Sequence, residues 1–143
     1  MPPNILKFIE EKRIGVLAVK MLDSSPHAAT LHFAFDSETE TFIFMTNPTY
    51  RKSEPLLKQD STPASLVIGV DESDLRTLQL DGIAKLSREP QVQAVYLKKF
   101  PEKEKKLKED ILITFKPTWW RYTDWTGSTG KTILASTDSQ AIK

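Results

Sequence analysis

Residues 46–53 carry the side chains of this sequence that are best suited to hold an anion. Thr46 ends an apolar run, and Arg51 and Lys52 follow it after a short turn. Ser53 then opens a segment with a helical pattern, whose first free N–H groups carry the positive end of the helix dipole. A hydroxyl, two cations and a helix start in one turn predict a phosphate pocket. The alternative is that Arg51 and Lys52 are simply solvated.

Composition argues against several other kinds of site. The 143 residues have a net charge of +1 and 27% charged residues, which disfavours nucleic acid or an anionic membrane as a partner. The absence of cysteine rules out disulfides and thiol nucleophiles, and a reducing compartment is expected. His27 and His32 are the only histidines and no carboxylate cluster lies near them, so no metal site is predicted. Neither a signal peptide nor a membrane-spanning run is seen, so we expect a cytoplasmic protein.

The predicted elements indicate one domain, 1–143, that is mainly β with flanking helices. Apolar alternation predicts six strands, over 14–21, 27–35, 41–46, 63–70, 77–86 and 110–115. Gly82, inside the fifth of these strands, predicts a bulge or the close approach of another backbone. Early hairpins and one late helical excursion favour an antiparallel barrel over alternating βαβ units.

The last third of the chain contains a helix, a charged run and a tail. Helical spacing predicts a helix that ends before Pro101. The lysine and glutamate run 102–109 is expected to be a solvated helix held by i,i+4 charge pairs. Gly, Ser and Thr residues make 127–143 a loose tail, with one candidate strand at 132–134.

The segment Phe44 to Ser53 resembles part of the FMN-binding split-barrel family typified by pyridoxamine 5'-phosphate oxidase. That family carries an aromatic strand, a threonine, a short turn and Arg-Lys before a helix. Further similarities are Pro26-His27-Ala28-Ala29, Gly82, Phe100-Pro101 and Trp119-Trp120-Arg121-Tyr122 with Asp124. The resemblance covers about residues 5–125. It implies a six-stranded antiparallel split β-barrel of Greek-key type, forming a homodimer with FMN at the seam between its subunits.

The resemblance also implies which residues hold the cofactor. The FMN phosphate would be bound by Thr46, Arg51, Lys52 and Ser53, in agreement with the phosphate pocket predicted above. The flavin ring would lie along Thr30, Leu31 and His32, with Met45 beneath the ribityl chain. The remaining cofactor-binding candidates are Gln79 and Trp120. Neighbours on a strand face opposite ways, so Trp119 and Trp120 cannot both face a ligand, and simple burial is the alternative for each.

Two departures from the oxidase argue against vitamin B6 oxidation. Ala28 and Phe33 stand where the oxidase has an arginine and a lysine, so the charge that would hold pyridoxal phosphate is missing. We therefore expect an FMN-binding, oxidoreductase-like protein with an unidentified substrate. His32 is its one candidate proton donor, because histidine can exchange a proton near neutral pH. The alternatives are a non-catalytic module that binds or stores flavin, deazaflavin or haem, and a structural dimer without a cofactor.

Overall fold

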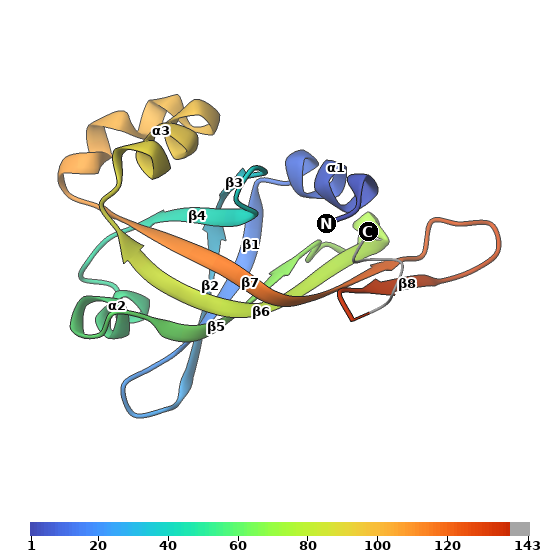
Figure 1. The fold of residues 1–143 in the computed structure, drawn as a ribbon, viewed down its shortest axis with the longest axis horizontal. Coiled ribbons are helices and arrows are strands. Elements are labelled where there is room, and N and C mark those ends of the chain that lie inside the picture. The colour runs from blue at the N-terminus through green and yellow to red at the C-terminus, as the bar shows by residue number, and fades with distance from the viewer. Residues whose placement is uncertain (138–143) are drawn as a thin grey trace.

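The computed structural model describes residues 1–137 as one antiparallel sheet with flanking helices (Figure 1). The elements in chain order are α1 (Pro3–Glu11), β1 (Ile14–Lys20), β2 (Pro26–His32), β3 (Ala34–Asp36), β4 (Thr41–Thr46), η1 (Arg51–Ser53), α2 (Glu54–Lys58), β5 (Thr62–Ile68), η2 (Glu72–Asp74), β6 (Arg76–Ser87), α3 (Pro90–Lys99), η3 (Pro101–Lys108), β7 (Ile111–Asp124) and β8 (Thr132–Ala135). The elements labelled η are 3-10 helices, which have three residues per turn. No helix in this part of the chain is long and apolar enough to cross a membrane.

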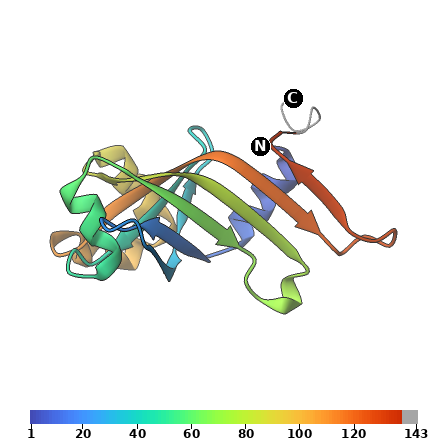
Figure 2. The ribbon, with the colours of Figure 1, turned by 90° about the horizontal axis from the view of Figure 1, so that it is seen from below.

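The sheet curls until its two ends approach each other. Its strand order is β2-β1-β5-β6-β7-β4-β3, with β8 added beside β7. The strands β5, β6 and β7 arch across the molecule (Figure 2). As a result β2 and β4 contact each other although no ladder of hydrogen bonds joins them. The barrel is therefore open between β2 and β4, which is the split-barrel architecture expected from the sequence.

The structure has eight strands where six were predicted. The stretch 27–35, predicted as one strand, forms β2 and β3, which pair with β1 and β4 respectively. The break falls at Phe33, whose side chain is fully buried and whose N–H donates to the Arg13 carbonyl at 3.0 Å. Because β2 and β3 are the first and last strands in the sheet order, the chain passes from one end of the sheet to the other at Phe33.

Part of the segment predicted to be a loose tail is a strand. β8 confirms the candidate strand at 132–134 and pairs with the end of β7. Together they form an arm that extends beyond the rest of the sheet (Figure 1). The remainder of the predicted tail, 138–143, lies outside the described residues.

Gly82 lies at a bulge between β6 and β7, as predicted. The register shifts after Asp81, where Gly82 pairs with Pro117. A Cβ atom placed on Gly82 would lie 2.1 Å from the carbonyl oxygen of Lys116. Only glycine therefore allows the two strands to cross this closely.

Two apolar clusters hold the helices against the sheet. In the main core, Ile5, Phe8 and Ile9 of α1 are fully buried, since helical spacing places them on one face. Phe8 packs against Tyr122 of β7 with ring centroids 5.5 Å apart. The second cluster comprises Ala34, Ile43, Met45, Tyr96, Phe100 and Leu112. It fixes α3 beside β3 and β4, at the open side of the barrel.

Candidate functional site

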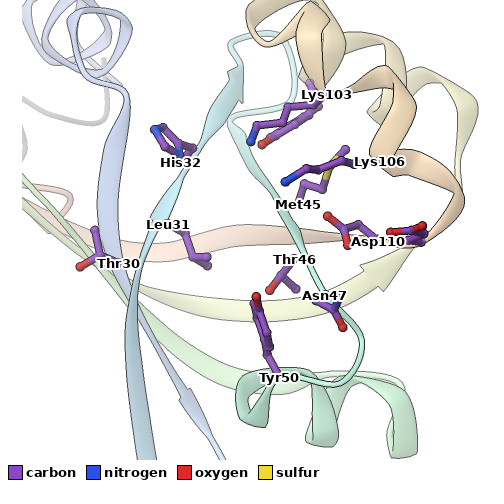
Figure 3. Close-up of a pocket in the computed structure, with 12 residues that line it drawn as sticks. Thr30, Leu31, His32, Met45, Thr46, Asn47, Tyr50, Lys103, Lys106 and Asp110 are labelled. Atoms are coloured by element: carbon purple, nitrogen blue, oxygen red, sulfur yellow. The ribbon is translucent and has the colours of Figure 1, made fainter.

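A cavity of about 290 Å³ lies where the barrel is split, between β2 and β4 (Figure 3). The helix η3 forms its third side. Its lining residues are Thr30, Leu31, His32, Met45, Thr46, Asn47, Tyr50, Tyr96, Lys103, Lys106, Glu109 and Asp110. These residues come from segments far apart in the sequence, which the curled sheet brings together.

Five of the predicted cofactor-binding residues line this cavity, namely Thr30, Leu31, His32, Met45 and Thr46. Leu31 is half-buried against the main core, and Met45 is buried in the second cluster, so both are held by packing. His32 is exposed at the rim, where its imidazole lies edge-on to Phe100 with ring centroids 5.5 Å apart. The three residues of β2 that were predicted to lie along the flavin ring therefore form one wall of this cavity.

Thr46 brings an unsatisfied hydroxyl to the cavity. Its side chain is 4% exposed, and its Oγ1 has no hydrogen-bond partner within residues 1–137. A buried polar group without a partner costs roughly 1–3 kcal/mol. A ligand atom that hydrogen-bonds to Thr46 would remove this cost.

The turn after β4 is braced by its own hydrogen bonds. The Asn47 side-chain oxygen accepts from the Thr49 N–H at 2.9 Å and from the Thr49 hydroxyl at 2.6 Å. Ser53 is fully buried, and its hydroxyl donates to the Asn47 carbonyl at 2.8 Å. The N–H of Ser53, expected to be free for a ligand, instead donates to the Tyr50 carbonyl at 2.9 Å. Ser53 therefore shapes the turn, and the helix start contributes no free group at this position.

Lys52 is buried without a carboxylate partner. It is 6% exposed, and in the described part of the chain it forms no ion pair within 4.0 Å. Its Nζ lies 4.6 Å from the ring centroid of Tyr50, which lines the cavity. Burial lowers the pKa of the Lys52 ammonium. Because a buried cation without a counter-ion is costly, an anion bound here would stabilise the protein.

Five of the ten predicted residues do not line the cavity, namely Lys52 and Ser53, described above, and Arg51, Gln79 and Trp120. Arg51 is exposed and lies near the turn between β1 and β2. There, hydrogen bonds from Ser25 lower the pKa of Asp23, and the charge of Arg51 adds a smaller effect in the same direction. Gln79 is exposed on the outer face of β6, and Trp120 is 7% exposed within the main core. Arg51, Gln79 and Trp120 therefore lie away from the cavity of their own chain.

Two lysines of the charged run 102–109 line the cavity, which the sequence analysis did not predict. The run was expected to be an α-helix with i,i+4 charge pairs, but it forms the 3-10 helix η3. Within residues 1–137 no ion pair joins a lysine and a glutamate of this run. Three residues per turn place Lys103 and Lys106 on the same side, facing the cavity (Figure 3). The position of these two lysines could not be predicted from the alternating charges, because a 3-10 helix has no distinctive sequence pattern.

Two tyrosines also line the cavity and were not predicted. Tyr50 points from the turn before η1 toward Thr46 (Figure 3). Burial raises the pKa of Tyr96 to about 12, and the charges of Glu102 and Asp110 add to the effect. The phenol of Tyr96 therefore stays protonated at neutral pH and can donate a hydrogen bond. Among the described residues, no group of three His, Asp or Glu side chains could hold a metal ion.

The outer face of the sheet carries a second feature. Two rows of cross-strand neighbours run over β2, β1, β5, β6 and β7, namely Thr30-Val16-Val67-Gln79-Arg121 and Ala28-Ala18-Ser65-Asp81-Trp119. All of these side chains are exposed or half-buried, so no helix of the described chain covers them. The rows are apolar and small over β1 and the start of β2. Thr30 belongs both to this face and to the cavity, so the two features adjoin.

The curled sheet, open between β2 and β4, defines a split-barrel protein with a cavity at that opening. The family model described as pyridoxamine 5'-phosphate oxidase matches residues 1–124. The chain belongs to this family. No curated relative matches the sequence at a significant level.

Solved structures of the same fold include proteins of different function. An FMN-binding protein related to pyridoxamine 5'-phosphate oxidase, from Nostoc punctiforme, has a TM-score of 0.66 at 14% identity, over 94% of this chain and 90% of that one. A protein related to general stress protein 26, from Clostridium acetobutylicum, has a TM-score of 0.63 at 15% identity, over 92% and 91%. The haem storage protein HutZ from Vibrio cholerae has a TM-score of 0.62 at 16% identity, over 80% and 88%. At these identities the likeness shows the shared fold.

Proposed function

We propose that the chain binds FMN in the cavity between β2 and β4, with the phosphate beside Thr46 and Lys52. The observation that carries this proposal is Lys52, a residue only 6% exposed whose ammonium lacks a carboxylate partner among the described residues. A phosphate monoester has between one and two negative charges at neutral pH and would supply the missing counter-ion. The unpaired hydroxyl of Thr46 would donate a hydrogen bond to the same group.

The flavin ring would lie along Thr30, Leu31 and His32. Met45 lines the cavity next to Thr46 in the chain, where it would lie beneath the ribityl chain. The cavity volume of about 290 Å³ is at the lower end of the range for ligand pockets, roughly 300–1,000 Å³. A cofactor of the size of FMN therefore needs a further wall beyond this chain.

A second copy of the chain would supply that wall by packing on the outer face of the sheet. Val16, Ala18 and Ala28 make the part of this face next to the cavity apolar, which suits sheet-on-sheet packing. Trp119 is half-buried on this face, whereas Trp120 is in the core, so Trp119 is the better candidate to reach a partner. The dimer is tested by sedimentation: Val16→Glu should give monomers that bind FMN more weakly, and an unchanged dimer contradicts this arrangement.

The redox chemistry would belong to the cofactor, and the chain would position it. When bound, FMN supplies reversible transfer of a hydride or of single electrons. The wall formed by residues 30–32 would orient the ring, and Tyr96 would donate a hydrogen bond from its protonated phenol. His32, exposed at the rim, would hold or release a proton at the open side of the cavity.

The absorbance spectrum of the purified protein tests the proposal. Flavin bands in the protein as isolated, or after incubation with FMN and desalting, support it. A preparation that binds no FMN at tens of micromolar contradicts it. Reduction of the bound flavin by NADH or NADPH would then separate an oxidoreductase from a carrier.

Haem binding or storage is the second candidate function. The observation that favours it is the exposed imidazole of His32, a potential axial ligand, on a fold shared with a haem storage protein. The same spectrum discriminates between the two, because haem has an intense Soret band that flavin lacks. Replacing His32 with alanine should abolish haem binding but leave phosphate-dependent FMN binding measurable.

A further inference from the structure

We infer that Lys103 and Lys106 form a second anion subsite, which binds a carboxylate or phosphate group of a small organic ligand at the η3 side of the cavity. The identification of that ligand as the substrate rests on the proposed function, whereas the subsite itself does not. Thr46 and Lys52 serve the cofactor phosphate on the η1 side. Thr46 and the two lysines of η3 therefore line the cavity from different elements, with Lys52 behind the η1 turn.

The backbone of η3 creates the subsite. In an α-helix, residues three apart are offset around the axis, but in a 3-10 helix they are eclipsed. Lys103 and Lys106 thus project in the same direction, and Figure 3 shows both amines pointing into the cavity above Met45. Lys105 and Lys108 belong to the same run but do not line the cavity.

The electrostatics of η3 indicate an anionic ligand. Two ammonium groups on one side of a short helix repel each other unless an anion lies between them. In the described chain neither Lys103 nor Lys106 has a carboxylate oxygen within 4.0 Å, although glutamates occur throughout the run. Lys103 is also half-buried, so its charge is less screened than that of a fully exposed lysine. The protonated phenol of Tyr96 adds a neutral donor to the same cavity.

The acidic residues at the end of η3 limit where the anion can bind. Glu109 and Asp110 line the cavity as well, just beyond the last turn of η3. Their charges repel an oxyanion from that end and confine it to the side of Lys103 and Lys106. Replacing Glu109 with glutamine should therefore tighten anion binding, whereas a cavity that takes a cationic group would bind its ligand more weakly after this change.

Titration of the FMN-loaded protein with inorganic phosphate tests the inference, with the flavin absorbance difference as the readout and NaCl holding the ionic strength constant. The Lys103→Gln, Lys106→Gln double variant should raise the half-saturating phosphate concentration roughly ten- to hundredfold, as expected for lost charge-assisted hydrogen bonds. The Lys105→Gln, Lys108→Gln variant carries the same change in net charge and should bind like the parent. Equal weakening in both variants, or in neither, overturns the inference. Acetate in a parallel titration shows whether a carboxylate or a phosphate fits better.

A cofactor-free arm keeps this test separate from the FMN proposal. In Lys52→Met protein the lysine of η1 is gone and the remaining η1 cation, Arg51, does not line the cavity, so calorimetric phosphate binding in the cavity reports the η3 side. Phosphate binding to Lys52→Met protein that disappears when Lys103→Gln and Lys106→Gln are added supports the subsite, even if FMN never binds. Normal FMN binding with no phosphate response at η3 overturns the subsite and leaves the cofactor proposal intact.

Discussion

Replacing Lys52 with methionine is predicted to have opposite effects on the cofactor-free protein and on FMN binding. Lys52 is 6% exposed and forms no ion pair among residues 1–137, so its charge lowers the stability of the protein when no anion is bound. Methionine has a similar length and no charge, so it fills the same space. The cofactor-free variant should therefore be more stable than the parent, and its affinity for FMN should be lower.

Both magnitudes follow from the surroundings of Lys52. Removing the unpaired charge of this largely buried side chain gains on the order of 1–2 kcal/mol, and losing its contact with the ring of Tyr50, at 4.6 Å, costs about 0.5 kcal/mol. The free energy of unfolding of the cofactor-free protein should then rise by about 1 kcal/mol. Loss of one charge-assisted contact to phosphate costs about 1.5–3 kcal/mol, which weakens FMN binding roughly ten- to hundredfold.

Urea unfolding of the cofactor-free protein and fluorescence titration with FMN measure the two effects. Lys58→Met is the matched control, because Lys58 lies on α2 but its side chain is 65% exposed. That variant should change neither quantity by more than about 0.5 kcal/mol. A Lys52→Met protein that is less stable than the parent and binds FMN equally well would refute the assignment of Lys52 to an anion site.

Three further predictions concern the cavity, the bulge and a half-buried lysine, Lys99. Thr46→Val should stabilise the cofactor-free protein by about 1 kcal/mol and weaken FMN binding about tenfold, because it removes a hydroxyl that only a ligand satisfies; equal affinity in the same fluorescence titration would count against the phosphate position. Gly82→Ala should lower the free energy of unfolding by about 3 kcal/mol or prevent folding, since its Cβ would lie 2.1 Å from a backbone oxygen. Gly127→Ala, whose nearest contact would be 3.4 Å, should be neutral in the same urea experiment. Burial, with a smaller effect of the Arg13 charge, lowers the pKa of Lys99 to about 8 from 10.5. The unfolded chain therefore binds more protons above pH 8, and the free energy of unfolding should rise between pH 7 and 9.5, by roughly 1 kcal/mol because solvent screens the half-exposed side chain. Lys99→Met should abolish this rise, and a rise that persists in the variant contradicts the assignment.

Local patterns allowed much of the fold to be predicted from the sequence. Helical spacing identified the helix that ends before Pro101, and Gly82 marked the bulge, because each depends on residues near in the chain or on one steric requirement. The division of 27–35 into β2 and β3 was not predictable from alternation, since both halves have strand character. The break at Phe33 arises because the sheet curls and the core takes that side chain.

The candidate site was predictable where it follows one strand and its turn, and not where it depends on tertiary structure. Thr46 and Lys52 occupy the motif that predicted an anion pocket, although only Thr46 lines the cavity. Lys103 and Lys106 were missed because alternating charges are typical of a solvated α-helix. Strand alternation required Trp119 and Trp120 to face opposite sides, which is confirmed, but which of them is buried depends on the inner face of the sheet.

Comparison of FMN with riboflavin tests the central claim most directly. The two ligands share the flavin ring and differ by the phosphate, so titration of the cofactor-free protein with each isolates the anion site. The account predicts that FMN binds at least roughly tenfold more tightly than riboflavin, and that Lys52→Met removes most of this difference. Equal affinities for the two ligands, or a difference that Lys52→Met leaves unchanged, would contradict it.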